Sequence, residues 1–131
     1  MNIQIFFLTV MIGAFAWTSS AATDPPIACN LKALTPEQRR ELEQLGKHVI
    51  SAIDTSRELH DGYSFRIDPA KASLVDVGRW LDLWRRCCPF YEFRIDFHAA
   101  DAMVWLSVSG RPGVKEYIPV DVPGLTPKLP K

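Results

Sequence analysis

The sequence lacks the short patterns that identify common enzyme classes. It has no G-x-S-x-G nucleophile elbow, no H-E-x-x-H zinc motif and no phosphate-binding loop. It has three cysteines but no C-x-x-C pair and no zinc-finger spacing. Gly110 and Gly113 alone do not indicate a phosphate-binding loop. A turn before a helix is enough to explain these two glycines. Hydrolase or transferase activity therefore has no positive support in the sequence.

An excess of charge of one sign is also missing. The chain carries 15 Lys and Arg against 15 Asp and Glu, so its formal net charge is zero. A nucleic-acid-binding domain normally has a basic excess, and a balanced surface has no strong attraction to anionic lipid. We therefore expect no nucleic-acid partner and no strong membrane binding once the N-terminal segment has been removed.

The N-terminal segment has no charged residue before Asp24. Its apolar run, residues 3–17, has the length of a signal-peptide core and is shorter than the roughly 20 residues of a membrane-spanning helix. Residues 18–22 are small and fit the small-x-small rule for cleavage. We predict a cleavable signal peptide at residues 1–21 and a secreted or periplasmic protein. No Lys or Arg precedes the apolar run, so retention as a membrane anchor is the alternative.

The rest of the chain has the size of one domain, since removing 21 of 131 residues leaves 110. Residues 22–28 are expected to form an extended linker, because two adjacent prolines exclude a helix. Residues 29–119 are expected to form a single domain. The tail, residues 120–131, contains three prolines and is expected to be extended or disordered.

Helices are predicted at three places. Thr35 and Gln38 form a capping box around Pro36, which predicts an amphipathic helix of about 16 residues. A second helix is expected from about Ala70 to Arg86, and a short third one from Val114 to about Ile118. Pro119 is expected to prevent any long continuation of the third helix.

Alternating apolar residues predict two β-hairpins. The first joins residues 55–59 to residues 63–67 through Asp61 and Gly62, where glycine would supply the positive φ of a tight turn. The second joins residues 93–98 to residues 103–109. The order α-ββ-α-ββ-α predicts an α+β fold, a two-layer domain with a four-stranded antiparallel sheet and the helices on one face.

The hexapeptide Arg85-Arg86-Cys87-Cys88-Pro89-Phe90 carries a family resemblance. The sequence resembles a group of small, largely uncharacterised bacterial proteins with this double-cysteine signature, over about residues 29–118. The resemblance implies domain boundaries but no settled activity. Members of the family are usually short and have no signal peptide, so the predicted export sets this chain apart.

The cysteines are the candidate functional groups, because adjacent cysteines are seldom needed for packing. A disulfide between Cys87 and Cys88 would close a small, strained ring, whereas a bond from Cys29 to either is easier. Arg85 and Arg86 would favour a thiolate there, while the C-terminal end of a helix opposes it.

Three interpretations of these cysteines remain open. Cys29, Cys87 and Cys88 could bind a thiophilic ion such as Zn²⁺, Cu⁺, Hg²⁺ or arsenite, which requires their sulfur atoms to lie within about 4 Å of each other. Cys29 could exchange a disulfide with one neighbour in a redox reaction. One disulfide could also simply stabilise a structural or interaction domain. Three further candidates are predicted to be solvated surface residues: His48, His60 and His98.

Overall fold

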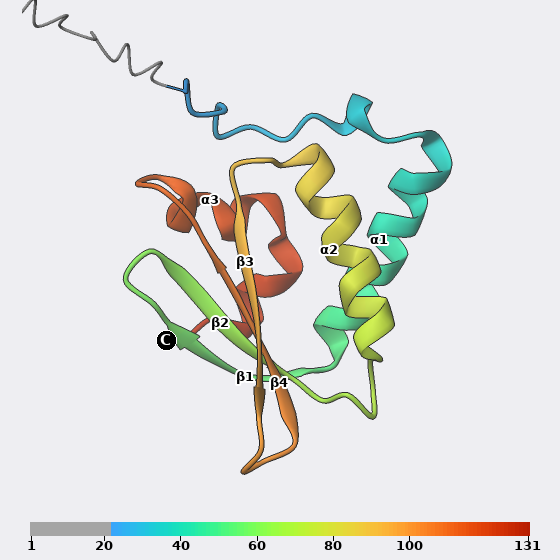
Figure 1. Ribbon diagram of the computed structural model, residues 1–131, viewed down its shortest axis with the longest axis vertical. Coiled ribbons are helices and arrows are strands. Elements are labelled where there is room, and N and C mark those ends of the chain that lie inside the picture. Colours follow the sequence, from blue (N-terminus) through green and yellow to red (C-terminus); the bar gives the residue numbers. More distant parts are fainter. Residues whose placement is uncertain (1–21) are drawn as a thin grey trace, which may run out of the picture.

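The computed structural model describes residues 22–131, so the predicted signal peptide lies outside the described residues. Four strands form one antiparallel sheet in the order β1-β2-β4-β3. They are β1 (Ile53–Glu58), β2 (Gly62–Ile67), β3 (Glu92–His98) and β4 (Met103–Ser109). Helices precede, separate and follow the two hairpins, as Figure 1 shows, so the predicted α+β order is confirmed.

The helices begin and end at recognisable local signals. They are α1 (Pro36–Ser51), α2 (Leu74–Cys87) and α3 (Val114–Asp121), with two 3-10 helices, η1 (Leu31–Ala33) and η2 (Pro123–Lys128). The capping box at α1 is confirmed: Thr35 accepts from the Gln38 backbone N–H, and the Gln38 side chain accepts from the Thr35 N–H. Both orphan N–H groups are thereby satisfied at the helix start.

The start of α2 differs from the prediction by four residues. The residues before it form a separate turn, in which the Asp68 carbonyl accepts from the backbone N–H groups of Lys71 and Ala72. Ser73 is the N-cap instead, and its hydroxyl accepts from the Asp76 backbone N–H. The apolar pattern continues through the turn, so periodicity alone placed the boundary too early.

The glycine of the first hairpin has a different role from the predicted one. Positive φ angles occur, among residues 22–131, only at Ala102 and Gly113. Gly62 instead opens β2 opposite Ser109, and a side chain there would collide with the carbonyl oxygen of Val108. Glycine is required at this position for close approach of two strands.

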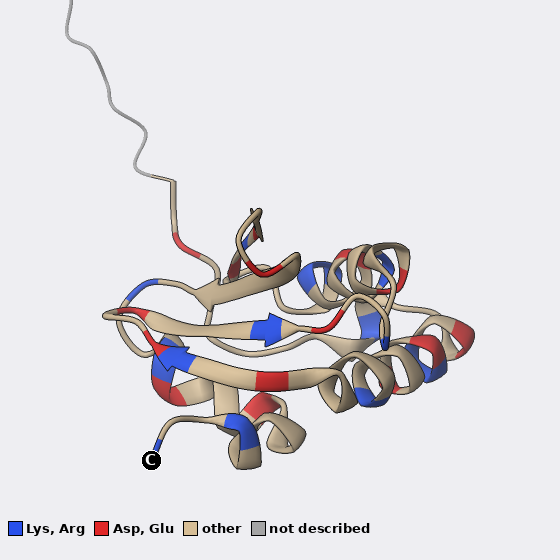
Figure 2. Ribbon diagram, turned by 90° about the horizontal axis from the view of Figure 1, so that it is seen from below, with Lys and Arg blue, Asp and Glu red and all other residues tan. Residues whose placement is uncertain are grey.

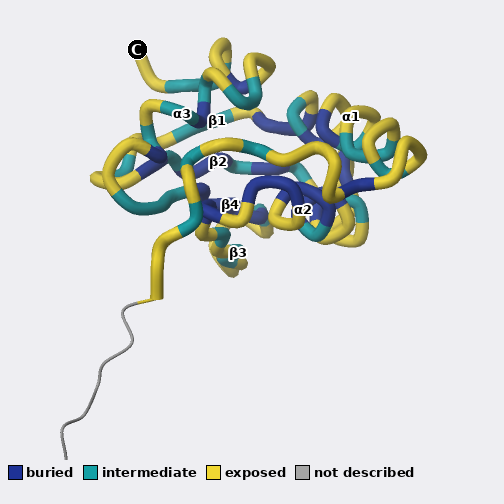
Figure 3. The backbone as a smooth tube through the Cα atoms, turned by 90° about the horizontal axis from the view of Figure 1, so that it is seen from above, coloured by how far each residue is buried: buried dark blue, intermediate teal, exposed yellow. Residues whose placement is uncertain are grey.

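One face of the sheet carries the core. Phe65, Ile67, Leu106 and Val108 are almost completely buried and belong to the same apolar cluster as residues from all three helices. Figure 3 shows this buried layer between the sheet and the helices. The expected placement of the helices on one face of the sheet is thus confirmed.

On the opposite face of the sheet, no helix of residues 22–131 packs. Trp105 lies there, outside the core cluster, with the Arg57 guanidinium 3.9 Å from its ring centroid. Ser64 and Ser107 are neighbours on this face and hydrogen bond at 3.1 Å. Acidic and basic residues are interspersed along the elements in Figure 2.

The C-terminal tail is more ordered than the prolines suggested. α3 continues past Pro119 to Asp121, and the N–H of the C-cap residue Val122 bonds to Ile118 O. Leu125 of η2 is buried in the core, and the Lys128 ammonium donates to the Ile53 carbonyl. The expectation of an extended or disordered tail is therefore wrong. None of the helices in residues 22–131 is long and apolar enough to cross a membrane.

Candidate disulfide site

A disulfide joins the start of the domain to the end of α2. Cys29 and Cys88 are bonded across 59 residues of sequence, with 4.4 Å between their Cα atoms. The Asn30 backbone N–H donates to the Cys87 carbonyl at 2.7 Å, which holds the two segments side by side. Cys88 follows the last residue of the helix, with φ −126° and ψ 74°. Cys88, and not the adjacent Cys87, is the partner of Cys29.

Asp121 at the end of α3 faces this disulfide. Its Oδ1 atom lies 3.3 Å from the Cys29 sulfur, and its Oδ2 atom lies 3.8 Å from the Cys88 sulfur. Two donors fix the carboxylate from the other side: Trp84 Nε1 donates to Oδ2 at 2.9 Å and the Tyr91 hydroxyl donates to it at 3.0 Å. The carboxylate is thus held rigidly against both sulfur atoms.

Cys87 is a free thiol buried beside the disulfide. Its sulfur lies 3.4 Å from the Cys88 sulfur, and its S–H donates to the Trp84 carbonyl at 3.3 Å. Burial, and then the nearby negative charge of Asp121, raise the pKa of the Cys87 thiol above its ordinary value. The neutral thiol is a poor nucleophile, so Cys87 does not readily attack the disulfide.

Aromatic rings surround the carboxylate of Asp121. Trp84 stacks on Trp80 with 4.8 Å between ring centroids and also contacts Tyr91 at 4.9 Å. Burial and the Asp121 carboxylate raise the pKa of the Tyr91 hydroxyl far above its ordinary value. Tyr91 therefore stays a hydrogen-bond donor throughout the normal pH range.

The disulfide opens onto a groove between α1, α2 and the α3–η2 segment. The groove has a volume of about 630 Å³, which suits a small ligand or a short peptide segment. Both disulfide cysteines and Asp121 line it, and its walls are mainly apolar. Leu31 and Val120 lie at its rim with 52% and 68% of their surfaces exposed. An exposed apolar rim of this kind favours contact with an apolar partner.

The structure brings the predicted cysteines together and adds one residue that the sequence did not indicate. Within residues 22–131, the one group of possible metal ligands is Cys29, Cys88 and Asp121, whose ligand atoms lie within 4.8 Å of one another. Cys87 contacts this group but is not part of it. Asp121 was missed because its segment was expected to be extended, and nothing in its spacing relates it to a cysteine.

The histidines lie outside this site. His48 on α1 is 3.6 Å from Asp76, and both side chains are exposed by more than a third. His60 lies between β1 and β2, and the exposed His98 stacks near Trp105 on the open face of the sheet at 5.7 Å. None of the three lines the groove beside the disulfide.

Comparisons with known proteins add no assignment. No protein-family model, curated protein or solved structure matches the chain. The resemblance to the double-cysteine bacterial proteins therefore stays a prediction, and the chemistry of the site has to be argued from its own geometry.

Proposed function

We propose that this protein is an exported thiol–disulfide exchange protein whose reactive bond is Cys29–Cys88. The observation that carries the proposal is the carboxylate of Asp121, which lies 3.3 and 3.8 Å from the two disulfide sulfurs. A disulfide has no proton to donate, so these contacts are not satisfied hydrogen bonds in the oxidised state. Two thiols at the same positions could donate to the carboxylate. Asp121 therefore stabilises the reduced form relative to the oxidised form.

The accessibility of the two sulfurs sets the order of bond exchange. Cys29 is partly exposed, whereas Cys88 is only 1% exposed. A thiolate of a dithiol partner attacks the Cys29 sulfur, the Cys29–Cys88 bond breaks, and Cys88 leaves with the electron pair. The proton that the attacking thiol has lost passes to Cys88, and Asp121 is placed to transfer it.

A second step completes the reaction. The other thiol of the partner attacks the mixed disulfide and releases Cys29, which takes up the second proton. The partner loses two electrons and becomes a disulfide, and the protein gains them and becomes a dithiol. The reverse sequence reduces a partner disulfide. Cys87 takes no part because its raised pKa keeps it protonated.

The lining of the groove indicates the chemical class of the molecule that bears the partner thiol. Its walls are formed largely by Leu42, Ile50, Trp80, Tyr117 and Val122. The charges at the side, Glu43 and Lys47, already pair with each other at 2.7 Å. An apolar peptide segment or apolar small molecule bearing thiols therefore fits this surface better than a small charged thiol.

Redox titration tests the proposal. The protein is expressed from its full coding sequence in a host that exports it, equilibrated with defined thiol–disulfide buffers, alkylated and analysed by mass spectrometry. We expect a midpoint potential for Cys29–Cys88 above about −300 mV, the value below which structural disulfides of secreted proteins lie. Cys87→Ala is the matched control, since it removes a sulfur and leaves the disulfide. If the Cys29–Cys88 bond stays oxidised well below that potential, the proposal is contradicted and the bond is a structural disulfide.

A second candidate is binding of a soft metal or metalloid ion by the reduced protein, which the sequence suggested for Cys29, Cys87 and Cys88. The observation that favours it is the clustering of Cys29, Cys88 and Asp121 within 4.8 Å, with sulfur ligands for a thiophilic ion. Titration of the reduced protein with Zn²⁺ or Cd²⁺ should then give one equivalent of binding. The binding should be lost in Cys29→Ser and retained in Cys87→Ala. Equal loss in both variants would instead support ligation by all three cysteines.

A further inference from the structure

The outer strand of the sheet, β3, has an unpaired edge. The strand order β1-β2-β4-β3 places β3 last, and within residues 22–131 only β4 pairs with it. Its register with β4 is continuous from Glu92 to His98, without a bulge. The strand contains no proline and no bulge, two features that usually keep an edge strand from pairing with another chain. Its charged residues, Glu92, Arg94 and Asp96, would oppose pairing only where like charges meet.

The sequence of β3, Glu-Phe-Arg-Ile-Asp-Phe-His, is complementary to itself when it is read in the opposite direction. Two copies paired antiparallel about Ile95 place Arg94 opposite Asp96 of the second copy, twice. The same register places Glu92 opposite His98, Phe93 opposite Phe97, and Ile95 opposite Ile95. Each opposite-charge or aromatic pair across strands is stabilising, whereas like charges directly opposite are destabilising.

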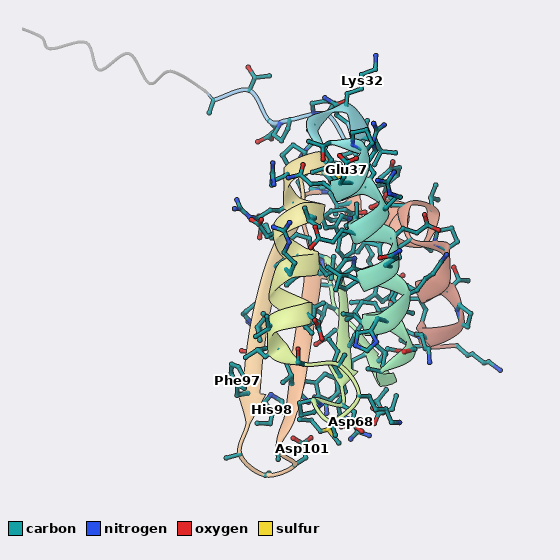
Figure 4. The ribbon with its side chains drawn as sticks, turned by 90° about the vertical axis from the view of Figure 1, so that its right-hand side faces the viewer. Lys32, Glu37, Asp68, Phe97, His98 and Asp101 are labelled. Carbon is teal, nitrogen blue, oxygen red and sulfur yellow. A yellow bond between two sulfur atoms is a disulfide. The ribbon has the colours of Figure 1, made fainter. Side chains whose placement is uncertain are left out.

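The two faces of such a pair agree with the two faces of the sheet. Arg94 and Asp96 lie on the open face, where they already contact each other at 2.8 Å within one chain. Phe93 lies on the helix face, with its ring 5.0 Å from that of Trp84. Phe97 lies on the same face but is 66% exposed, because the strand continues beyond the helices. Figure 4 shows Phe97 and His98 near the end of the β3–β4 hairpin, far from Lys32 and Glu37 at the opposite end.

Antiparallel pairing would bring the covered half of one β3 against the uncovered half of the other. Phe93, beside α2 of one copy, would then cover the exposed ring of Phe97 of the second copy. The backbone N–H and C=O groups on the outer edge would also gain partners. From this strand geometry we infer that the protein forms a two-fold dimer through β3, with one continuous sheet of both copies and all helices on the same side.

Charge reversal tests this dimer. The exported full-length gene product is studied by sedimentation equilibrium up to about 1 mM, where even a pair with a millimolar dissociation constant is substantially associated. We expect a dimer for the natural chain. Arg94→Asp and Asp96→Arg should each weaken association by about tenfold or more, since each places like charges opposite one another twice. The double variant restores opposite charges and should recover the dimer.

Arg85→Asp is the matched control, because Arg85 is an exposed arginine of α2 that pairs only with Asp82 in its own helix. It should leave association unchanged. A chain that remains a monomer at all concentrations overturns the inference. A dimer whose association is unchanged in both single charge-reversal variants also overturns the inference. The inference is likewise overturned if the double variant does not recover the association of the natural chain. Circular dichroism of each variant separates loss of association from loss of folding.

Discussion

The substitution Asp121→Asn tests the central chemical argument quantitatively. The asparagine oxygen can replace Oδ2 and still accept from Trp84 and Tyr91, while the amide group replaces Oδ1 beside the Cys29 sulfur. The variant removes the negative charge and turns one acceptor into a donor, with little change of shape. It therefore probes the preference for the reduced state rather than the packing of the site.

The expected magnitude follows from two opposing contributions. Closing a loop of 59 residues stabilises the folded protein by about 4 kcal/mol through the entropy of the unfolded chain. Against this, two S–H donors gained by Asp121 on reduction stabilise the dithiol by about 1 kcal/mol each, as weak donors to a charged acceptor. The oxidised protein should thus exceed the reduced one in unfolding free energy by about 2 kcal/mol in the natural chain. In Asp121→Asn the difference should be about 3 kcal/mol, because the variant keeps an oxygen beside Cys88 and loses the one beside Cys29.

Two assays measure this difference independently. Urea unfolding with and without a reductant gives the two unfolding free energies directly. The redox equilibrium of the folded protein measures the same difference, and a change of about 1 kcal/mol corresponds to a midpoint potential lower by about 20 mV in the variant. A potential that is unchanged or higher in Asp121→Asn would refute the role assigned to the carboxylate.

Two further predictions concern the fold around the site. Because burial raises the pKa values of Cys87 and Tyr91, their neutral forms contribute stability that is complete at neutral pH. That stability should be lost as pH rises past the ordinary values of 9.0 and then 10.0, and pH-dependent unfolding curves of Cys87→Ala and Tyr91→Phe should each lack one part of the loss. Gly62→Ala should destabilise the domain by about 1–3 kcal/mol, since the added methyl group meets the Val108 carbonyl; unchanged urea unfolding would contradict this.

Much of the fold could be predicted because its signals are local. The capping box at Thr35 and the alternation in residues 63–67 and 103–109 each report directly on a helix start or a half-buried strand. The start of α2 was less predictable, because a turn can carry apolar residues at helical spacing until a serine hydroxyl supplies the first cap.

The candidate site could be predicted only in part because it is assembled from three distant segments. The three cysteines could be predicted as candidate functional groups from their residue type alone. The pairing of Cys29 with Cys88 and not with Cys87 is specified by no spacing rule, because the two candidates are adjacent in sequence. Asp121 depends on the packing of the last dozen residues, where Leu125 holds the segment in the core and overrides the extended tendency of its prolines.

The position of these three segments along the chain also matters while the protein is being made. Synthesis delivers the N-terminal part first. Cys29 therefore emerges well before the adjacent pair Cys87 and Cys88, and Asp121 emerges last of these four residues. Between the emergence of Cys88 and that of Asp121, the chain offers Cys29 two neighbouring partners without the carboxylate that contacts the Cys29 and Cys88 sulfurs in the folded protein. Correct disulfide pairing consequently requires the chain to be synthesised as far as Asp121. Truncation before Asp121 should yield a mixture of Cys29–Cys87 and Cys29–Cys88 isomers.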